Sequence, residues 1–229
     1  MDILQVKNIT KKFDDRVIID NVSFNIPRGR IVGLLGKNGS GKTTILKMIN
    51  DLLTIDSGEI LINGKPISAD TKLSVSFLPE RSYLDNSRTV LQTFHFFQDF
   101  YPDFDIILAQ KLLSDLDIDI NTKLSKMSKG MKEKVQLILV MSRHASLYIL
   151  DEPLGGVDPS TRDYILKTIL TNFDSNSSLL ITTHLVADVE KILDDVIMID
   201  QGKVILSDTA DNLCNQHSAS IDEIFRRVL

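Results

Sequence analysis

Nine consecutive residues decide the fold that this sequence is expected to adopt: Gly36-Lys37-Asn38-Gly39-Ser40-Gly41-Lys42-Thr43-Thr44. They fit the phosphate-binding loop pattern, in which a glycine and four further residues are followed by Gly-Lys-Thr. Glycines let the backbone curl tightly, so successive N–H groups and the start of the next helix point at one anion. A glycine-rich turn before a helix is the alternative interpretation, and the flanking sequence decides between the two.

That flanking sequence has the order strand, loop, helix. Residues 31–35 are a short apolar run typical of a buried parallel strand, and residues 44–49 begin a helical stretch. Lys42 would supply a point charge to the β and γ phosphates, and the Thr43 hydroxyl would be a ligand of Mg²⁺. We therefore expect all nine residues to take part in binding a nucleoside triphosphate.

Length and composition exclude several classes of protein. The 229 residues suit one large domain, and the net charge of −5 gives no general attraction to nucleic acid or anionic lipid. A single cysteine, Cys214, excludes an internal disulfide. The N-terminus enters a strand pattern directly, without a signal peptide, and no apolar run approaches the roughly 18 residues of a membrane span. If the protein works at a membrane, another chain must supply the membrane part.

The remaining patterns indicate an α/β protein. Residues 2–30 read as antiparallel strands, at 2–6, 16–20 and 22–26, with a turn at Asp14-Asp15. Residues 57–65 read as a strand entering an Asn-Gly turn. From about residue 81 to 143 helical spacing dominates, which predicts an inserted helical subdomain. Further strands are expected at 73–78, 147–150, 178–183, 196–199 and 204–206, and further helices at 130–143, 160–173, 186–192 and in a short tail from about 209 to 229.

Six aromatic side chains crowd into eleven residues of the helical region, more than one helix face needs: Phe94, Phe96, Phe97, Phe100, Tyr101 and Phe104. One interpretation is that they form the core of a small helical subdomain. The other is that part of the cluster stays exposed as a docking patch, since large exposed apolar patches usually mark interfaces.

Two later segments supply the chemistry of a nucleotide site. The apolar run 147–150 ends in Asp151, which can hold Mg²⁺ through water, and Glu152, which can polarise an attacking water. An acidic pair after a strand is a weak signal by itself and a strong one downstream of a phosphate-binding loop. The strand 178–183 is followed directly by His184. A lone histidine is usually a core residue with satisfied hydrogen bonds, but at the end of this strand we interpret it as part of the nucleotide site.

These features together resemble the ATP-binding cassette ATPases, over residues 2 to about 215. The segment Lys126–Met131 is similar to the family's Leu-Ser-Gly-Gly-Gln signature and stands, like it, at the start of a helix before the acidic pair. The resemblance implies a P-loop NTPase fold. Its core would be a mixed sheet like that of RecA, with an N-terminal antiparallel β-subdomain and the helical insertion, all in a single ATPase domain over residues 1–229.

By this resemblance, two cassettes would bind head to tail around two ATP molecules, as a homodimer or as a heterodimer with another ATPase subunit. Ser128 and the Gly130 backbone of one copy would contact the γ-phosphate held by the other copy, because a hydroxyl and a helix N-terminus together bind anions. Asp158 matches the loop that communicates between the copies.

Within one copy, the resemblance assigns catalysis to Lys42, Glu152 and His184. Glu152 would be the general base, and His184 would bind the γ-phosphate and help to fix the attacking water. Phe13 would stack on adenine, where only a π face is needed, with Val17 beside it. Mg²⁺ would be held by Thr43, Asp151 and Glu80.

Three departures from the family pattern stand out. Lys129 and Met131 replace a glycine and the glutamine of the signature, although Ser128 and Gly130 remain. Glu80 stands where the family usually has a glutamine that senses Mg²⁺ and the membrane partner. The loop before Asp158 begins with two glycines, Gly155 and Gly156. None of these changes removes a catalytic group, so we expect an active site.

We therefore expect a subunit that hydrolyses ATP to power a separate multi-span permease, in the direction of export. It would lie on the inner face of the cell membrane, held there by the permease, and would bind no nucleic acid. A soluble cassette ATPase acting on ribosomes or DNA is the main alternative, but such relatives usually carry two cassettes or a long coiled coil and a basic surface. A nucleotide-dependent module without hydrolysis is a third, which Glu152 and His184 argue against.

Overall fold

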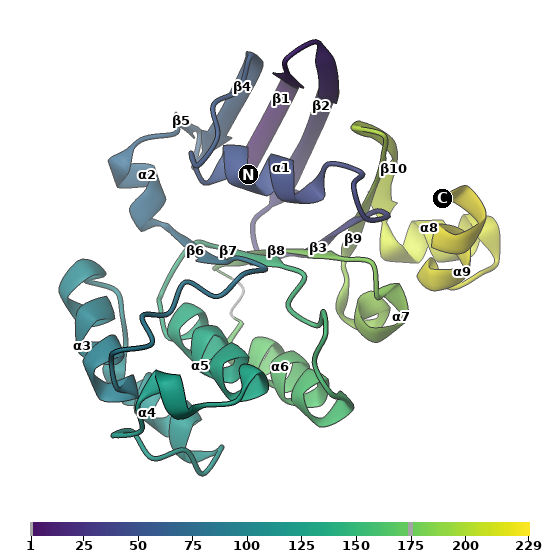
Figure 1. Ribbon diagram of the computed structural model, residues 1–229. Coiled ribbons are helices and arrows are strands. Elements are labelled where there is room, and N and C mark those ends of the chain that lie inside the picture. The colour runs from purple at the N-terminus through teal and green to yellow at the C-terminus, as the bar shows by residue number, and fades with distance from the viewer. Residues whose placement is uncertain (1, 174–175) are drawn as a thin grey trace.

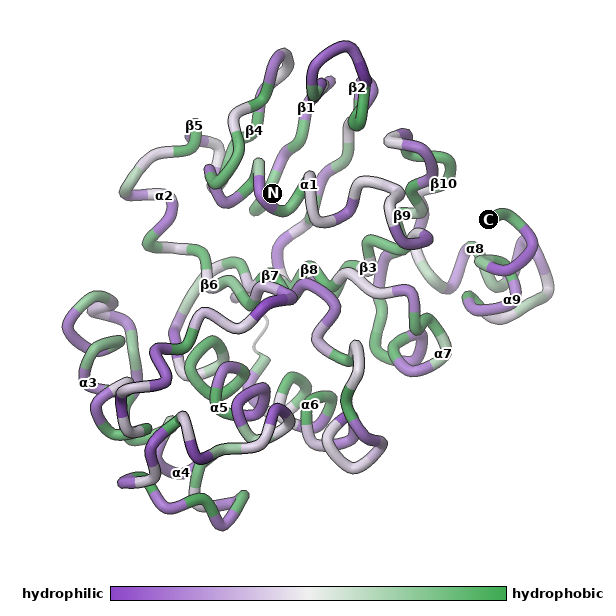
Figure 2. Tube along the Cα trace, viewed as in Figure 1, coloured by the Kyte–Doolittle hydropathy of each residue, from purple (hydrophilic) through white to green (hydrophobic). Residues whose placement is uncertain are grey.

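A computed structural model describes residues 2–173 and 176–229 of the chain. Its elements lie in layers (Figure 1): an antiparallel sheet, helix α1 (Lys42–Ile49), a central mixed sheet, and further helices on the opposite face of that sheet. One apolar core fills the space around α1 between the two sheets, and a second lies beneath the central sheet. The central strands and the inward faces of the helices are hydrophobic along the trace (Figure 2).

The outer sheet has the strand order β2-β1-β4-β5. Its strands are β1 (Asp2–Phe13), β2 (Arg16–Pro27), β4 (Ser57–Ile62) and β5 (Lys65–Pro66). The expected antiparallel strands are confirmed, but β1 extends beyond Val6 to Phe13, and the two strands expected at 16–26 are one. Shifts of register at Val6/Ile9, Ile9/Lys11 and Lys11/Lys12 explain the difference, because bulges let a strand continue where its alternation breaks.

The central sheet has the strand order β10-β9-β3-β8-β7-β6. It comprises β3 (Ile31–Leu35), β6 (Val75–Leu78), β7 (Leu147–Asp151), β8 (Ser178–Thr183), β9 (Asp195–Asp200) and β10 (Lys203–Thr209). All neighbours are parallel except β9 and β10, so the predicted mixed sheet is confirmed. Leu35 pairs with Thr183, and Asp151 with Thr182, which aligns the carboxyl ends of β3, β7 and β8 at one edge.

The helices on the far side of the central sheet are α5 (Lys129–Met141) and α6 (Pro159–Asn172), with α7 (Val186–Val189) and the 3₁₀ turn η2 (Glu190–Ile192) nearby. The tail folds as α8 (Ala210–His217) and α9 (Ile221–Val228), as expected. The short helix α2 (Ala69–Leu73) was not predicted. Its N-terminus is fixed by a reciprocal cap between Ser68 and Thr71, so the strand expected from residue 73 begins at Val75.

The insertion between β6 and β7 is helical, as predicted, and contains α3 (Val90–Phe100), α4 (Ile106–Ser114), η1 (Leu124–Lys126) and α5. Part of its aromatic cluster is core and part is exposed, and docking of a partner on the exposed part stays a prediction. Phe94, Phe97 and Phe104 are buried, whereas Phe96 is 39% exposed and Phe100 62% exposed. No helix within residues 2–173 and 176–229 combines the length and the apolar character that crossing a membrane requires.

Candidate active site

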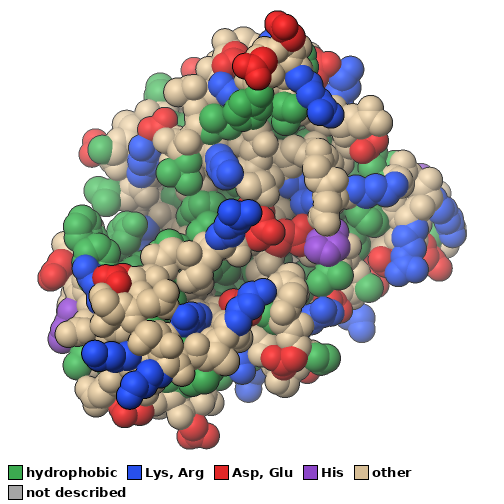
Figure 3. Space-filling model, viewed as in Figure 1, with side chains coloured by type: hydrophobic (Ala, Val, Ile, Leu, Met, Phe, Trp, Pro, Cys, Tyr) green, Lys and Arg blue, Asp and Glu red, His purple; other side chains and the backbone are tan. Residues whose placement is uncertain are grey.

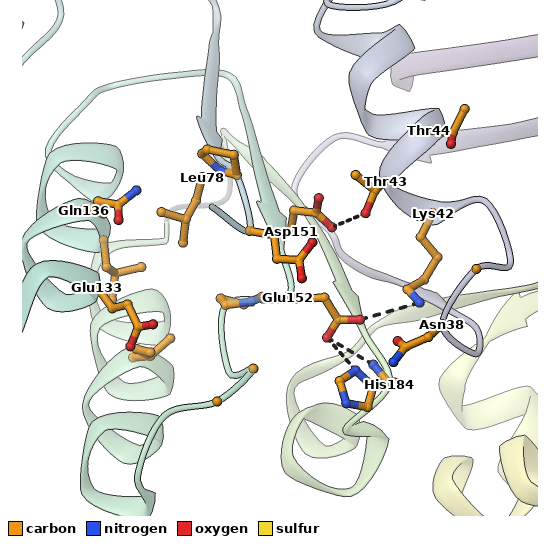
Figure 4. Close-up of a pocket in the computed structure, with 18 of the residues that line it drawn as sticks. Asn38, Lys42, Thr43, Thr44, Leu78, Glu133, Gln136, Asp151, Glu152 and His184 are labelled. Carbon is orange, nitrogen blue, oxygen red and sulfur yellow. Dashed lines mark hydrogen bonds and ion pairs between the residues drawn. The ribbon is translucent and has the colours of Figure 1, made fainter. Parts of the chain in front are cut away.

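The aligned carboxyl ends of β3, β7 and β8 open onto a cavity of about 700 Å³. In Figure 4 the phosphate-binding loop forms one wall, helix α5 the opposite wall, and Asp151, Glu152 and His184 lie between them. Charged side chains gather around this hollow on the molecular surface (Figure 3). Six of the nine loop residues line the cavity: Asn38, Gly39, Gly41, Lys42, Thr43 and Thr44.

The backbone of the phosphate-binding loop requires glycine at two positions. Gly39 and Gly41 have φ values of +81° and +111°, a region that favours glycine. A Cβ atom at Gly41 would also lie 2.5 Å from Cδ1 of Ile19 on β2. The loop can therefore lie tightly against β2 and still turn its N–H groups toward the start of α1, where an anion is favoured.

Lys42 is buried at the first position of α1, with only 5% of its surface exposed. Its ammonium donates to the carbonyl oxygens of Gly36 at 2.7 Å and Lys37 at 3.2 Å, and lies 3.5 Å from Oε1 of Glu152. The lysine is thus almost enclosed by its own chain, with its amino group directed at Glu152 in the wall of the cavity.

Three oxygen-bearing side chains meet beside Lys42. The Thr43 hydroxyl lies 3.3 Å from Oδ1 of Asp151, and the Thr182 hydroxyl donates to the same atom at 2.7 Å. Burial is the main reason that the pKa of Asp151 is raised, and the negative charge of Glu80 adds to the effect. A buried carboxylate that is costly to ionise is stabilised by a cation, and carboxylate and hydroxyl oxygens are the ligands that Mg²⁺ prefers.

The described residues do not form a complete metal cage. In the described parts of the chain no group of three or more acidic, histidine or cysteine side chains is arranged to hold a metal ion. This fits Mg²⁺, which keeps several waters and is commonly bound by one or two protein groups together with substrate phosphates.

Glu152 is held on several sides. Its φ of +49° is uncommon for a non-glycine residue, and its N–H donates to both the carbonyl and the hydroxyl oxygen of Thr182 at 3.1 Å. Oε2 accepts from the His184 N–H at 3.3 Å and lies 2.9 Å from its Nδ1. Oε1 is buried and has no hydrogen-bond partner among the described residues, and the Lys42 ammonium lies 3.5 Å from it.

Other predicted site residues lie outside this cavity. Ser128 caps α5 by accepting from the Met131 N–H at 3.2 Å, and Asp158 caps α6 through Thr161 and Ser160. These hydrogen bonds hold the pKa of Asp158 well below its ordinary value. A Cβ built on Gly130 would lie 4.0 Å from Oδ2 of Asp158, so the N-termini of α5 and α6 are neighbours.

The residues predicted to contact the base, Phe13 and Val17, also lie outside the lining of this cavity. Phe13 is 48% exposed and Val17 is 43% exposed, at the end of the β1–β2 hairpin. The cavity reaches this hairpin at Ile18. Three loop residues, Gly36, Lys37 and Ser40, do not line the cavity, and the Lys37 ammonium donates to the main-chain carbonyl of Leu229.

Helix α5 contributes a wall that the sequence patterns did not predict. Lys129, Glu133 and Gln136 line the cavity, at the i, i+4 and i+7 spacing of one helix face. Oε2 of Glu133 and Nε2 of Gln136 are buried and have no hydrogen-bond partner among the described residues, and burial raises the pKa of Glu133. The signal was present as a polar stripe beside the apolar face of α5, but such stripes usually face solvent.

Comparison with known proteins gives the same family by sequence and by structure. A family model described as "ABC transporter" matches residues 19–155. The chain is 32% identical, over 83% of its length and 66% of the relative's, to ABC transporter ATP-binding protein YtrB of Bacillus subtilis (strain 168). It is 30% identical, over 90% of its length and 88% of the relative's, to SkfA peptide export ATP-binding protein SkfE of the same organism.

A solved structure described as the ATP-binding subunit of an ABC transporter superposes with a TM-score of 0.88 at 27% identity, over 98% of both chains. The superposition includes both sheets and the helical insertion, and the family model includes the phosphate-binding loop and the acidic pair. The chain belongs to the ABC transporter family, in which it is an ATP-binding subunit with ATPase activity.

Proposed function

We propose that this subunit hydrolyses ATP to power export by a separate membrane-spanning partner, and that two cassettes close head to tail around ATP to do so. The observation that best supports hydrolysis is the position of the Glu152 carboxylate. One of its oxygens is held by His184, and the other lies 3.5 Å from the ammonium of Lys42 in the wall of the nucleotide cavity.

Binding of ATP would rearrange the pairing of Lys42. Its ammonium would exchange the carbonyl oxygens of Gly36 and Lys37 for phosphate oxygens, which are stronger partners because they are charged. The exchange would also free Oε1 of Glu152 from Lys42. That oxygen could then take the proton of a water as the water attacks the γ-phosphorus and the bond to ADP breaks.

His184 and the residues expected to hold Mg²⁺ have supporting roles in this proposal. His184 orients the Glu152 carboxylate before the water arrives, which lowers the entropy that the reaction must lose. Thr43, Asp151 and Glu80 would hold Mg²⁺, which would supply positive charge to offset the negative charge of the phosphates.

Closure of two cassettes would account for the site residues outside the cavity. Ser128 is exposed at the start of a 13-residue helix, whose free N–H groups and dipole favour an anion. Gly130 follows two residues later, and a Cβ built there would meet only Oδ2 of Asp158, at 4.0 Å. We propose that the phosphate bound by one copy meets this helix start on the other copy, with Lys129 adding positive charge.

The partner would dock on the aromatic groove, by which we mean a hollow of about 390 Å³ that includes Tyr83, Phe97 and Tyr101 in its lining. Next to the groove, the ring of Phe96 lies 6.5 Å from that of Phe97 and 4.6 Å from that of Phe100. Hydrophobic side chains gather at this edge of the molecule, between α2 and α3 (Figure 3). Pro79 lines both the groove and the nucleotide cavity, so movement of a docked partner would reach Glu80 directly.

Export is proposed because SkfE, most of whose length the chain matches, is an export protein by its name. The test is purification of the tagged chain from gently solubilised native membranes, followed by mass spectrometry. We expect a stoichiometric multi-span protein to accompany it. Recovery only from the soluble fraction, together with ribosomal or DNA-associated proteins, would contradict the transporter role.

A further inference from the structure

We propose that Lys11 and Asp56 are positioning residues for the base of ATP, because together they set the ring of Phe13 as a stacking platform. This inference rests on the stacking of Phe13 on adenine that the family resemblance implies. It concerns how the protein fixes the far end of the nucleotide, about which the phosphate-binding loop gives no information.

Lys11 is an unusual lysine for a strand. Its side chain is only 9% exposed, and it lies two residues after buried Ile9 on β1. A buried ammonium needs a charged partner to stay ionised, and Nζ of Lys11 finds one in Oδ1 of Asp56 at 2.7 Å.

Asp56 holds β1 at three points from the turn that precedes β4. Besides the ion pair with Lys11, its Oδ2 accepts from the Lys12 N–H at 2.6 Å, and its own N–H donates to the Thr10 carbonyl at 3.0 Å. The register of β1 against β2 shifts on both sides of Lys11. The direction in which the chain leaves this irregular stretch, and therefore the place of Phe13, depends on the contacts of Asp56.

The Lys11 ammonium also acts on Phe13 directly. It lies 5.7 Å from the centre of the ring, within the range of a cation–π contact. Phe13 is 48% exposed, so part of the ring is free to meet a base. A ring that is already oriented loses less side-chain freedom when a base stacks on it.

The same hairpin is tied to the phosphate-binding loop. Lys11 pairs with Ile19 across the hairpin, and Cδ1 of Ile19 lies 2.5 Å from the position that a Cβ at Gly41 would take. Ile18, the residue before Ile19, lines the nucleotide cavity. The platform and the phosphate site are therefore connected by two residues of β2, and the Lys11–Asp56 pair fixes the end of the hairpin beyond them.

The test separates the base from the phosphates. Dissociation constants for ATP and for inorganic tripolyphosphate are measured by calorimetry on the full chain and on Lys11→Met, which keeps the length of the side chain and removes the charge. We expect ATP binding to weaken by about three- to tenfold, the range that a cation–π contact corresponds to. Tripolyphosphate binding is expected to stay unchanged, and Lys11→Arg should retain most of the ATP affinity.

Lys7→Met is the matched control, because Lys7 lies on the same strand and also pairs with an acidic residue, Glu59, at 3.5 Å. That pair is about half exposed, and both affinities should be unchanged by its loss. If Lys11→Met lowers the melting temperature, Asp56→Asn tests the same link, because it keeps an acceptor for Lys12 and weakens the hold on Lys11.

Phe13→Ala completes a double-mutant cycle. The inference predicts that Lys11→Met causes no further loss of ATP affinity when Phe13 is already absent. An equal loss of tripolyphosphate affinity, or the same loss in the Phe13→Ala background, would overturn it. If Lys11→Met binds ATP with full affinity while Phe13→Ala binds it weakly, the positioning role of Lys11 is wrong and the stacking role of Phe13 is retained. Full ATP affinity in Phe13→Ala would instead remove the platform itself.

Discussion

The Lys42 ammonium lies among acceptors of its own chain, with the Gly36 carbonyl at 2.7 Å and Oε1 of Glu152 at 3.5 Å. Each of these acceptors can be exchanged for a phosphate oxygen without leaving the buried charge unpaired. That matters energetically, because an uncompensated buried charge is far more costly than a lost surface ion pair. At the scale of single residues, the site is therefore prepared for a phosphate before one binds.

His184 gives the first prediction at this scale. His184→Ala should lower kcat for ATP hydrolysis by roughly 10²-fold, because Glu152 loses the group that orients it. The ATP dissociation constant should change far less, since Lys42 and the loop remain. His144→Ala is the matched control: His144 also lies near an aspartate, Asp105, at 3.6 Å, but its side chain is 69% exposed and outside the cavity. An unchanged kcat in His184→Ala would rule out the orienting role.

At the scale of elements, the carboxylate of Asp158 caps the N-terminus of helix α6. Asp158 accepts from the Thr161 N–H at 3.0 Å and from the hydroxyls of Ser160 and Thr161. These hydrogen bonds lower its pKa below the ordinary value of 3.8, so the stabilisation is fully present above that pH. It is lost as the pH falls through the lowered pKa, because the carboxyl then binds a proton.

The pH dependence of this stabilisation leads to a prediction for α6. Asp158→Ala should lower the melting temperature at pH 7, and the gap to the unmodified chain should narrow only in strongly acid solution. Asp163→Ala, which removes an exposed carboxylate of the same helix, is the control and should have little effect at either pH. A gap that stays the same from pH 7 into strong acid would contradict the capping role of the charge.

The aromatic groove gives a prediction for α3. Phe100→Ser should leave the melting temperature of the isolated chain nearly unchanged, because the side chain is 62% exposed, and should weaken recovery of the membrane partner. Leu170→Ser on α6 replaces a side chain that is 52% exposed away from the groove and should affect neither. Phe94→Ala should instead cost about 3–5 kcal/mol of stability, since Phe94 is fully buried. Undiminished recovery with Phe100→Ser would remove the groove as the docking surface.

At the scale of the whole molecule, most of the framework could be predicted from local patterns. The glycine loop, the acidic pair and His184 each follow an apolar strand, and parallel strands bring their carboxyl ends to one edge of a sheet. The pairing of Leu35 with Thr183 and of Asp151 with Thr182 places them there. Local sequence was enough to predict these positions, because each motif directly follows the strand that places it.

What depends on distant contacts could not be predicted in the same way. The order of the strands is set by packing between segments far apart in sequence, and the patterns gave no order. Gln136 lies in the helix that the sequence predicts, yet its burial in the cavity wall follows from where α5 packs against the central sheet. The exposure of Phe96 and Phe100 beside buried Phe94 likewise depends on which face of α3 meets α4 and α5.

The central claim is that Glu152 takes the proton of the attacking water in an ATP site that is otherwise complete. The most direct measurement is phosphate release by Glu152→Gln at saturating ATP, with ATP affinity determined on the same sample. The amide keeps the shape of the side chain and cannot accept the proton, so we predict that hydrolysis falls by roughly 10²-fold or more. ATP should still bind, and nucleotide-bound dimers should accumulate. Phosphate release at the rate of the unmodified chain would contradict the account.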